Sequence, residues 1–123
     1  MADRPLGFPR AKRLRQHGEF ERVYQQNVYA ADLILVVQAC RNNGPVTRLG
    51  LSVSRRTGNA VIRNRWKRLI REAFRTQQSH LPAGLDLVVR PRKGAQPAFA
   101  DIRRSLLQLA RRVDRSLSHR RMP

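Results

Sequence analysis

The segment from Arg55 to Arg75 carries side chains suited to binding phosphate groups. Eight basic residues and one acid, Glu72, occupy its 21 positions. In a helix, like charges four residues apart, such as Arg63 and Lys67, are destabilising unless a partner neutralises them. A face that is merely solvated usually alternates in sign. The pattern therefore predicts a helix that binds a polyanion.

On a helical wheel this segment separates into an apolar face and a polar arc. The apolar face, which we expect to be buried, carries Ile62, Trp66, Leu69, Ile70 and Ala73. The adjacent arc carries Arg63, Asn64, Lys67, Arg68, Arg71 and Arg75. Val61 and Arg65 fall on the remaining side. Trp66, although flanked by basic residues, is expected to anchor the core rather than to stack on a base.

Residues 55–59 lie where a predicted strand leads into this helix. Asn59 can cap the helix, and helix N-termini approached through a glycine, here Gly58, bind phosphate through backbone N–H groups. Gly58 could equally serve turn geometry alone. The segment is no nucleotide-binding P-loop, because the Lys-Ser/Thr pair of that motif is missing. We expect Arg55, Arg56 and Asn59 to extend the phosphate-binding surface.

Phe20 and Tyr24 are spaced one helical turn apart and have two interpretations. Core packing is the commoner reason for such a pair. The alternative is a surface on which unpaired bases stack, as in proteins that hold single strands without reading their sequence. The spacing alone favours the core.

No arrangement typical of a catalytic site occurs in the sequence. The three histidines are scattered and have no cysteine partner at metal-ligand spacing. Glu19 and Glu21 are the nearest pair of acids that could serve a nuclease, and they point to different helix faces. The serine motif G-x-S-x-G does not occur. The residues thus predict a protein that binds, with no catalytic or metal-binding residue of its own.

The composition supports the same class. Lys and Arg number 26 against 8 Asp and Glu, a net charge of +18. So large an excess repels itself in a compact chain, and nucleic acid is the usual compensating partner. Arginine, 23 of the 26, suits bidentate phosphate contacts, although a GC-rich genome would also favour arginine codons.

The length predicts a single domain over residues 1–123, with a core of about residues 8–115 and mobile segments at 1–7 and 118–123. The one cysteine, Cys40, excludes an internal disulfide and is expected to be a buried thiol. No apolar run reaches the length of about 18 residues that a membrane span needs. The N-terminus does not resemble a secretory signal. We therefore expect a cytoplasmic protein that does not act at a membrane.

Hydrophobic periodicity predicts the order α-β-β-α-β-α. The predicted elements are a helix over Glu19–Gln26, strands over Leu33–Ala39 and Arg48–Ser54, a helix from Asn59 to about Gln77, an internal strand over Leu85–Val89 and a helix from Pro97 to about Arg115. The first two strands, joined by a turn at residues 42–45, are predicted to form a hairpin. A further short strand near residue 30 is an option. Together these predict an α/β (α+β) two-layer sandwich with a small, mostly antiparallel sheet.

Residues 56–74 resemble the signature of the bacterial ribonuclease P protein family. The matching core is Arg63-Asn64-Arg65 with Lys67-Arg68 and Arg71. The strand at residues 50–54 and the pairs Glu19-Phe20 and Val23-Tyr24 also match, so the resemblance covers about residues 8–115.

The resemblance implies a left-handed β-α-β crossover. It also implies a subunit of an endoribonuclease holoenzyme that removes the 5′ leader of precursor tRNA. The partners would be a large catalytic RNA, which carries out catalysis, and precursor tRNA, with no obligate protein partner. The basic helix would face the catalytic RNA, and magnesium would be held through the RNA, with no cofactor bound by the protein alone. Phe20, Tyr24 and Val36 would bind the leader, although the family often has an aromatic residue where this chain has residues 35–37.

Two other classes share some of these features. A ribosomal or other structural RNA-binding protein would have the charge and the arginine clusters, but no cleft for single-stranded RNA. A cationic membrane-surface protein could use the last predicted helix, but the apolar face of that helix is needed to cover the sheet.

Overall fold

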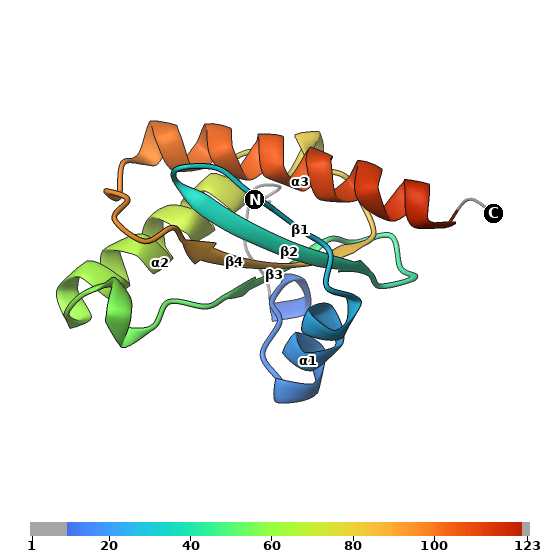
Figure 1. The fold of residues 1–123 in the computed structure, drawn as a ribbon, viewed down its shortest axis with the longest axis horizontal. Coiled ribbons are helices and arrows are strands. Elements are labelled where there is room, and N and C mark those ends of the chain that lie inside the picture. Colours follow the sequence, from blue (N-terminus) through green and yellow to red (C-terminus); the bar gives the residue numbers. More distant parts are fainter. Residues whose placement is uncertain (1–9, 122–123) are drawn as a thin grey trace, which may run out of the picture.

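The computed structural model describes residues 10–121, which form three α-helices, three short 3-10 turns and four strands (Figure 1). In chain order the main elements are α1 (His17–Gln26), β1 (Tyr29–Ala31), β2 (Leu35–Arg41), β3 (Arg48–Leu51), α2 (Ala60–Arg75), β4 (Leu85–Pro91) and α3 (Phe99–Arg121). The short turns are η1 (Arg10–Lys12), η2 (Arg55–Thr57) and η3 (Gln78–His80). The fold is therefore α+β as predicted, and β1 confirms the optional strand near residue 30.

The sheet has the order β1-β2-β4-β3. β1 pairs with β2 and β2 with β4 in antiparallel register, whereas β3 and β4 are parallel. The predicted hairpin between the strands at Leu33–Ala39 and Arg48–Ser54, which correspond to β2 and β3, is wrong, because β4 lies between them. The burial of β4 explains this: Leu85 to Val89 are all buried, so this strand needs a neighbour on each edge and cover on both faces. Its predicted internal position is confirmed.

The connection from β3 through α2 to β4 is a parallel crossover. Its left-handed sense, which the resemblance implies, stays a prediction. The chain that follows β3 leaves the sheet through η2 before α2 begins, so residues 52–59 lie beyond the paired strands (Figure 1).

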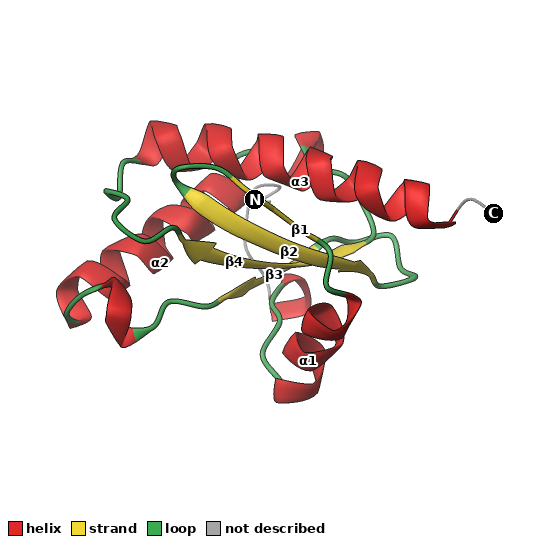
Figure 2. Cartoon of the chain, in the orientation of Figure 1, coloured by secondary structure: helices red, strands yellow, loops and turns green. Residues whose placement is uncertain are grey.

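Helices α2 and α3 pack on one face of the sheet and enclose the main core, which gives the predicted sandwich (Figure 2). The core includes Trp66 and Phe74 of α2, and Leu106 of α3, each at most 1% exposed. Trp66 is thus the core anchor that the sequence predicts. The other face of the sheet is covered in part by α1, through a smaller cluster of Leu14, Val23, Cys40 and Val88.

Alternation along the strands decides which residues reach each face. Leu35 and Val37 of β2 join the main core, whereas Cys40 contacts the α1 cluster. Cys40 is 2% exposed, which confirms the expected buried thiol, and burial raises its pKa. Val36 therefore belongs to the face of the sheet that carries α1.

Two expectations about element ends need correction. Ile62 was expected to be buried but is 40% exposed, because it lies in the first turn of α2, at the end that projects away from the sheet. Phe99, in the first turn of α3, is likewise 36% exposed. Helix α3 continues through Arg121, beyond the predicted end near Arg115, and the expected mobility of residues 118–121 stays a prediction. The expected mobility of residues 1–7 and 122–123 falls outside the described residues.

Candidate nucleic-acid interface

Helix α2 is fixed at its start and along one side, which determines where its cations point. The Asn59 side chain accepts a hydrogen bond from the Ile62 backbone N–H at 3.0 Å, so Asn59 is the predicted cap. Trp66, Ile70 and Phe74 hold the inner side of the helix in the core. The polar residues predicted to bind RNA point away from the core and form the α2 row: Arg63, Asn64, Arg65, Lys67, Arg68 and Arg71.

The charge of the α2 row is not neutralised by the acids of the part of the chain that the structure describes. Glu72 forms an ion pair with Arg75, and the hydrogen bond from Arg75 holds the pKa of Glu72 below its ordinary value. In residues 10–121 no acid forms an ion pair with Arg65, Lys67, Arg68 or Arg71. The row therefore offers several cations to an external anion.

The approach to α2 is a short turn with two exposed arginines. Ser54 Oγ accepts a hydrogen bond from the Arg56 backbone N–H at 3.3 Å, and Arg63 Nε donates to the Gly58 carbonyl at 3.2 Å. Gly58 has φ 151°, and a Cβ there would lie 3.1 Å from Ile62 Cγ2. Glycine is thus required by turn geometry. The expected phosphate binding at this turn stays a prediction, and one first-turn N–H already serves the Asn59 cap.

A cleft of about 840 Å³ opens on the sheet face that α1 leaves uncovered. Tyr29, Ala31 and Val36 line it from β1 and β2. Its other walls are residues 54, 56 and 57, and residues 90–95 at the end of β4 and in the loop that follows. Arg56, predicted as part of the surface of the basic helix, thus faces this cleft.

The three residues predicted to bind a single strand are placed differently. Val36 lines the cleft. Phe20 is half-buried and packs on Gly50, where a Cβ would lie 2.8 Å from Phe20 Cζ. Tyr24 is 37% exposed, with its ring centroid 6.5 Å from that of Phe20. Phe20 and Tyr24 lie beside the cleft on the same side of the sheet and are not part of its lining.

The cleft also contains residues that the sequence did not single out. Tyr29 is 61% exposed and pairs with Gln38 across β1 and β2. Arg90 pairs with Val36 in the register and donates from Nη1 to Gln38 Oε1 at 2.9 Å. Lys93 is exposed in the following loop. The available signal was an aromatic residue at the start of the optional strand and a basic cluster at the end of the last strand.

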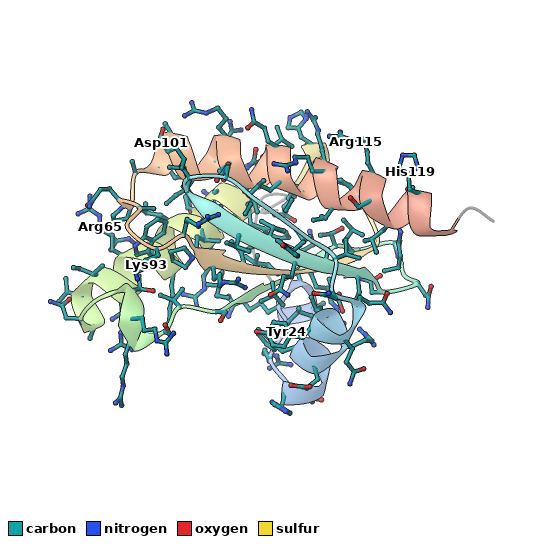
Figure 3. The ribbon with its side chains drawn as sticks, viewed as in Figure 1. Tyr24, Arg65, Lys93, Asp101, Arg115 and His119 are labelled. Carbon is teal, nitrogen blue, oxygen red and sulfur yellow. The ribbon has the colours of Figure 1, made fainter. Side chains whose placement is uncertain are left out.

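A smaller hollow of about 340 Å³ connects the two surfaces. It shares Thr57 and Ala95 with the cleft and is lined as well by Ile62 and Arg65 of α2. Figure 3 shows Arg65 and Lys93 at the same end of the molecule, with Tyr24 on α1 below the sheet. The α2 row and the cleft therefore adjoin.

Ion pairs fix α1 relative to the sheet and the cleft. Arg22 Nη2 donates to Asp86 Oδ2 at 2.6 Å, and Arg48 Nη1 donates to Glu19 Oε2 at 2.8 Å. Burial alone would raise the pKa of Asp86, but hydrogen bonds from Arg48, Asn42 and Arg22 hold it below its ordinary value. Asp86 is thus a buried carboxylate that stays charged.

Two kinds of feature are absent from residues 10–121. No group of three or more His, Cys, Asp or Glu side chains gathers as a metal site would require. No helix in this part of the chain has the length and apolar character of a membrane span.

Comparison with known proteins gives a consistent result. The family model for ribonuclease P matches residues 8–114. The ribonuclease P protein component of Brevibacillus brevis is 41% identical over 106 residues, which cover 85% of this chain and 84% of the relative. The component from Clostridioides difficile is 35% identical over 91% of this chain and 100% of its own length.

Solved structures agree with the sequence relatives. The Staphylococcus aureus RNase P protein is 36% identical and superposes with a TM-score of 0.73 over 83% of this chain and 94% of its own. The Thermotoga maritima RNase P protein is 34% identical, with a TM-score of 0.75 over 81% and 96%. On the match of the family model and the identity of these relatives, this chain belongs to the ribonuclease P protein family.

Proposed function

We propose that this chain binds the catalytic RNA of ribonuclease P through the α2 row and holds the 5′ leader of precursor tRNA in the cleft. Membership of the family gives it the role of a ribonuclease P subunit in the 5′ maturation of tRNA. The observation that carries the finer assignment is the connection between a row of unneutralised cations and a cleft suited to a single strand.

The α2 row suits a structured RNA because it is rigid and cationic. Each phosphate that it neutralises would release counterions, which makes binding strong at low salt and weak at high salt. Arginine adds bidentate contacts to phosphate oxygens. The buried side of α2 holds the row in one orientation, so binding RNA costs less conformational entropy.

The cleft suits an unpaired strand because cations and an exposed aromatic ring occur together. Arg56, Arg90 and Lys93 can follow the phosphates, and Tyr29 can stack on a base. Tyr24 extends the aromatic surface beside the cleft. Val36 supplies an apolar wall where the family often places an aromatic residue. Tyr29 lies close to this position, because it pairs with Gln38, two residues after Val36 in β2.

We assign hydrolysis of the phosphodiester bond to the RNA. Metal-activated water requires oxygen ligands to hold the metal, whereas six of the seven acids of residues 10–121 are engaged within the protein, and the seventh, Glu21, lies 3.6 Å from His17. Asp86, Glu19, Glu72, Asp101 and Asp114 each form an ion pair with an arginine. Asp32 accepts hydrogen bonds from two backbone N–H groups and Ser105. Magnesium would then be held through the RNA, and the cytoplasm is the expected location.

A reconstitution experiment tests this function. The protein is mixed with a bacterial ribonuclease P RNA and precursor tRNA at a magnesium concentration where the RNA alone is slow. Stimulated cleavage at the mature 5′ end, with no cleavage by RNA-free protein, is the expected result. Metal-dependent cleavage by rigorously RNA-free protein, or no stimulation, would overturn it. A purely structural RNA-binding protein would bind the RNA without raising the cleavage rate.

A further inference from the structure

The outer face of α3 carries a third set of cations, distinct from the α2 row and the cleft. Arg104, Arg111 and Arg115 follow one another at spacings of seven and four residues, and His119 lies four residues further along; all four side chains are exposed. They share the side of the helix that points away from the sheet. Figure 3 shows Arg115 and His119 on this outer side of α3, on the opposite side of the molecule from Tyr24.

The acids of α3 do not neutralise the middle of this face. Asp101 pairs with Arg104 at 2.8 Å, and Asp114 pairs with Arg41 of β2 at 2.7 Å. Within residues 10–121 no acid forms an ion pair with Arg111 or Arg115. These two arginines are four residues apart, so they repel each other on the free protein.

The position of α3 separates this face from the two surfaces already described. α3 packs on the side of the sheet opposite to the cleft, because Leu35 and Val37 contact the main core whereas Val36 lines the cleft. The residues of the cleft and of the adjoining hollow come from β1, β2, α2, β4 and the loops around them, with none from α3. A strand held in the cleft therefore does not cover Arg111 and Arg115.

We propose that the outer face of α3 binds the phosphate backbone of a second RNA segment in the assembled enzyme. The inference rests on the proposed function, since it requires that RNA surrounds the protein. Guanidinium groups bind phosphate oxygens in bidentate geometry, and the exposed hydroxyls of Ser116 and Ser118 are further phosphate donors. From Arg104 to Arg115 the face extends about 16 Å at 1.5 Å per residue, long enough for several phosphates.

A phosphate backbone fits this face better than a membrane surface does. An amphipathic helix at a membrane inserts its apolar side into the lipid. The apolar side of α3, with Ile102, Leu106, Leu109 and Val113, is at most 1% exposed and fills the main core. The exposed side of α3 is polar and cationic, as are protein surfaces that bind RNA through its phosphate backbone.

The test uses a double variant that carries both Arg111→Gln and Arg115→Gln. It is compared with a control variant of equal net charge. The control combines Arg15→Gln and Ser79→Asp, which removes one positive charge and adds one negative charge at exposed positions outside the three surfaces, so its net charge falls by the same two units. Each protein is titrated with the catalytic RNA over a range of salt concentrations, and each reconstituted enzyme is titrated with precursor tRNA. Thermal melting of all proteins checks that the fold is kept.

We expect the double variant to bind one of the two RNAs roughly three- to ten-fold more weakly than the control. The slope of log affinity against log salt should fall by about 1 to 2, because two phosphate contacts are lost. Weaker binding of the catalytic RNA would identify that RNA as the partner, and an effect confined to precursor tRNA would identify the substrate. The melting temperature should not fall, because two like charges are removed.

Two outcomes would overturn the inference. One is a double variant that matches the control in both titrations. The other is unchanged RNA binding together with a loss of binding to vesicles of phosphatidylserine and phosphatidylcholine, which would make α3 a membrane contact. Either outcome is distinguishable from failure of the proposed function, because wild-type protein would still stimulate 5′ cleavage in the same assays.

Discussion

Arg48 of β3 and Asp86 of β4 are joined by two hydrogen bonds, from Arg48 Nε to Asp86 Oδ1 at 2.8 Å and from Nη2 to Oδ2 at 2.7 Å. The same arginine reaches Glu19 of α1, and the same aspartate accepts from Arg22 of α1. One pair thus ties two parallel strands to the helix that carries Tyr24. The Asp86 side chain is fully buried and Arg48 is 24% exposed, so the carboxylate end of this link lies beneath the surface.

The first prediction concerns the stability that this pair gives the fold. Asp86→Ala removes the buried acceptor that Arg48, Arg22 and Asn42 share, leaving Arg48 with Glu19 as its remaining acid, and should lower the free energy of unfolding by about 3–5 kcal/mol. Asp114→Ala is the matched control, because it also removes one arginine partner but at a site where both side chains are partly exposed. Its expected cost is at most about 1 kcal/mol. Urea unfolding measures both, and equal losses would contradict the role given to Asp86.

A second prediction concerns how the free energy of unfolding depends on pH in the acid range. The pKa of Asp86 is held below its ordinary value, and backbone N–H groups of Arg15 and Gln16, followed by Arg48, lower the pKa of Glu19. A lowered pKa in the folded state gives stability that is present above the unfolded pKa, about 4. That stability is lost as pH falls through the folded value.

We therefore expect the wild-type free energy of unfolding to fall from about pH 5 downward, and to fall less steeply in Asp86→Asn. The variant begins less stable at pH 7, so the two curves should converge in acid. Urea titrations at pH 7, 5, 4 and 3 give the comparison. Parallel curves would show that Asp86 is not the group responsible.

The third prediction separates the two aromatic residues of α1. Tyr24→Leu keeps apolar bulk at an exposed position, so it should preserve the melting temperature and weaken binding of precursor tRNA to the reconstituted enzyme. Loss of one stacked base is worth roughly 1–3 kcal/mol. Mature tRNA should bind as before. Phe20→Leu, which leaves space beside Gly50, should instead lower the melting temperature.

Tyr29 offers an independent check on the same surface. Tyr29→Leu should weaken precursor binding by a similar amount, since Tyr29 is the exposed aromatic residue of the cleft lining. If Tyr24→Leu and Tyr29→Leu both leave precursor affinity unchanged, the leader does not lie along this face.

The fourth prediction concerns the α2 row. Arg65→Ala or Arg68→Ala should weaken binding of the catalytic RNA and reduce the salt slope by about 1 each, because each removes one phosphate contact. Arg63→Ala is a less specific test, since Arg63 also bonds the Gly58 carbonyl and supports the turn. Arg15→Ala, at an exposed position away from the row, is the control. Unchanged affinity and slope in both row variants would make the row a solvated face.

Much of the fold could be predicted because local pattern and tertiary contact agree. The helical spacing of Trp66 and Ile70 identified the buried side of α2, and the apolar run from Leu85 to Val89 identified an internal strand. The strand pairing could not be predicted in the same way. A turn between two strands favours a hairpin locally, but the burial needs of β4 decide the order, and they act over a distance along the chain.

In the candidate site, too, features set by local spacing could be predicted, and features set by strand pairing could not. Most of the α2 row follows from spacing within one helix, whereas Arg65, which the helical wheel placed on the remaining side, was predicted through the family signature. The cleft depends on which residues of β1, β2 and β4 share a face, and that depends on the register that pairs Val36 with Arg90. Tyr29 and Arg90 were missed for this reason. The four-residue spacing of Phe20 and Tyr24 favoured the core for both, and it could not show that Phe20 is partly buried while Tyr24 is exposed.

The most direct test of the account is the affinity of precursor tRNA and of mature tRNA for the catalytic RNA, measured with and without the protein. If the cleft holds the leader, the protein should tighten binding of the precursor much more than that of the mature tRNA, and the preference should grow as the leader lengthens to several nucleotides. Equal tightening of both substrates, or the same preference with RNA alone, would contradict leader binding by this chain.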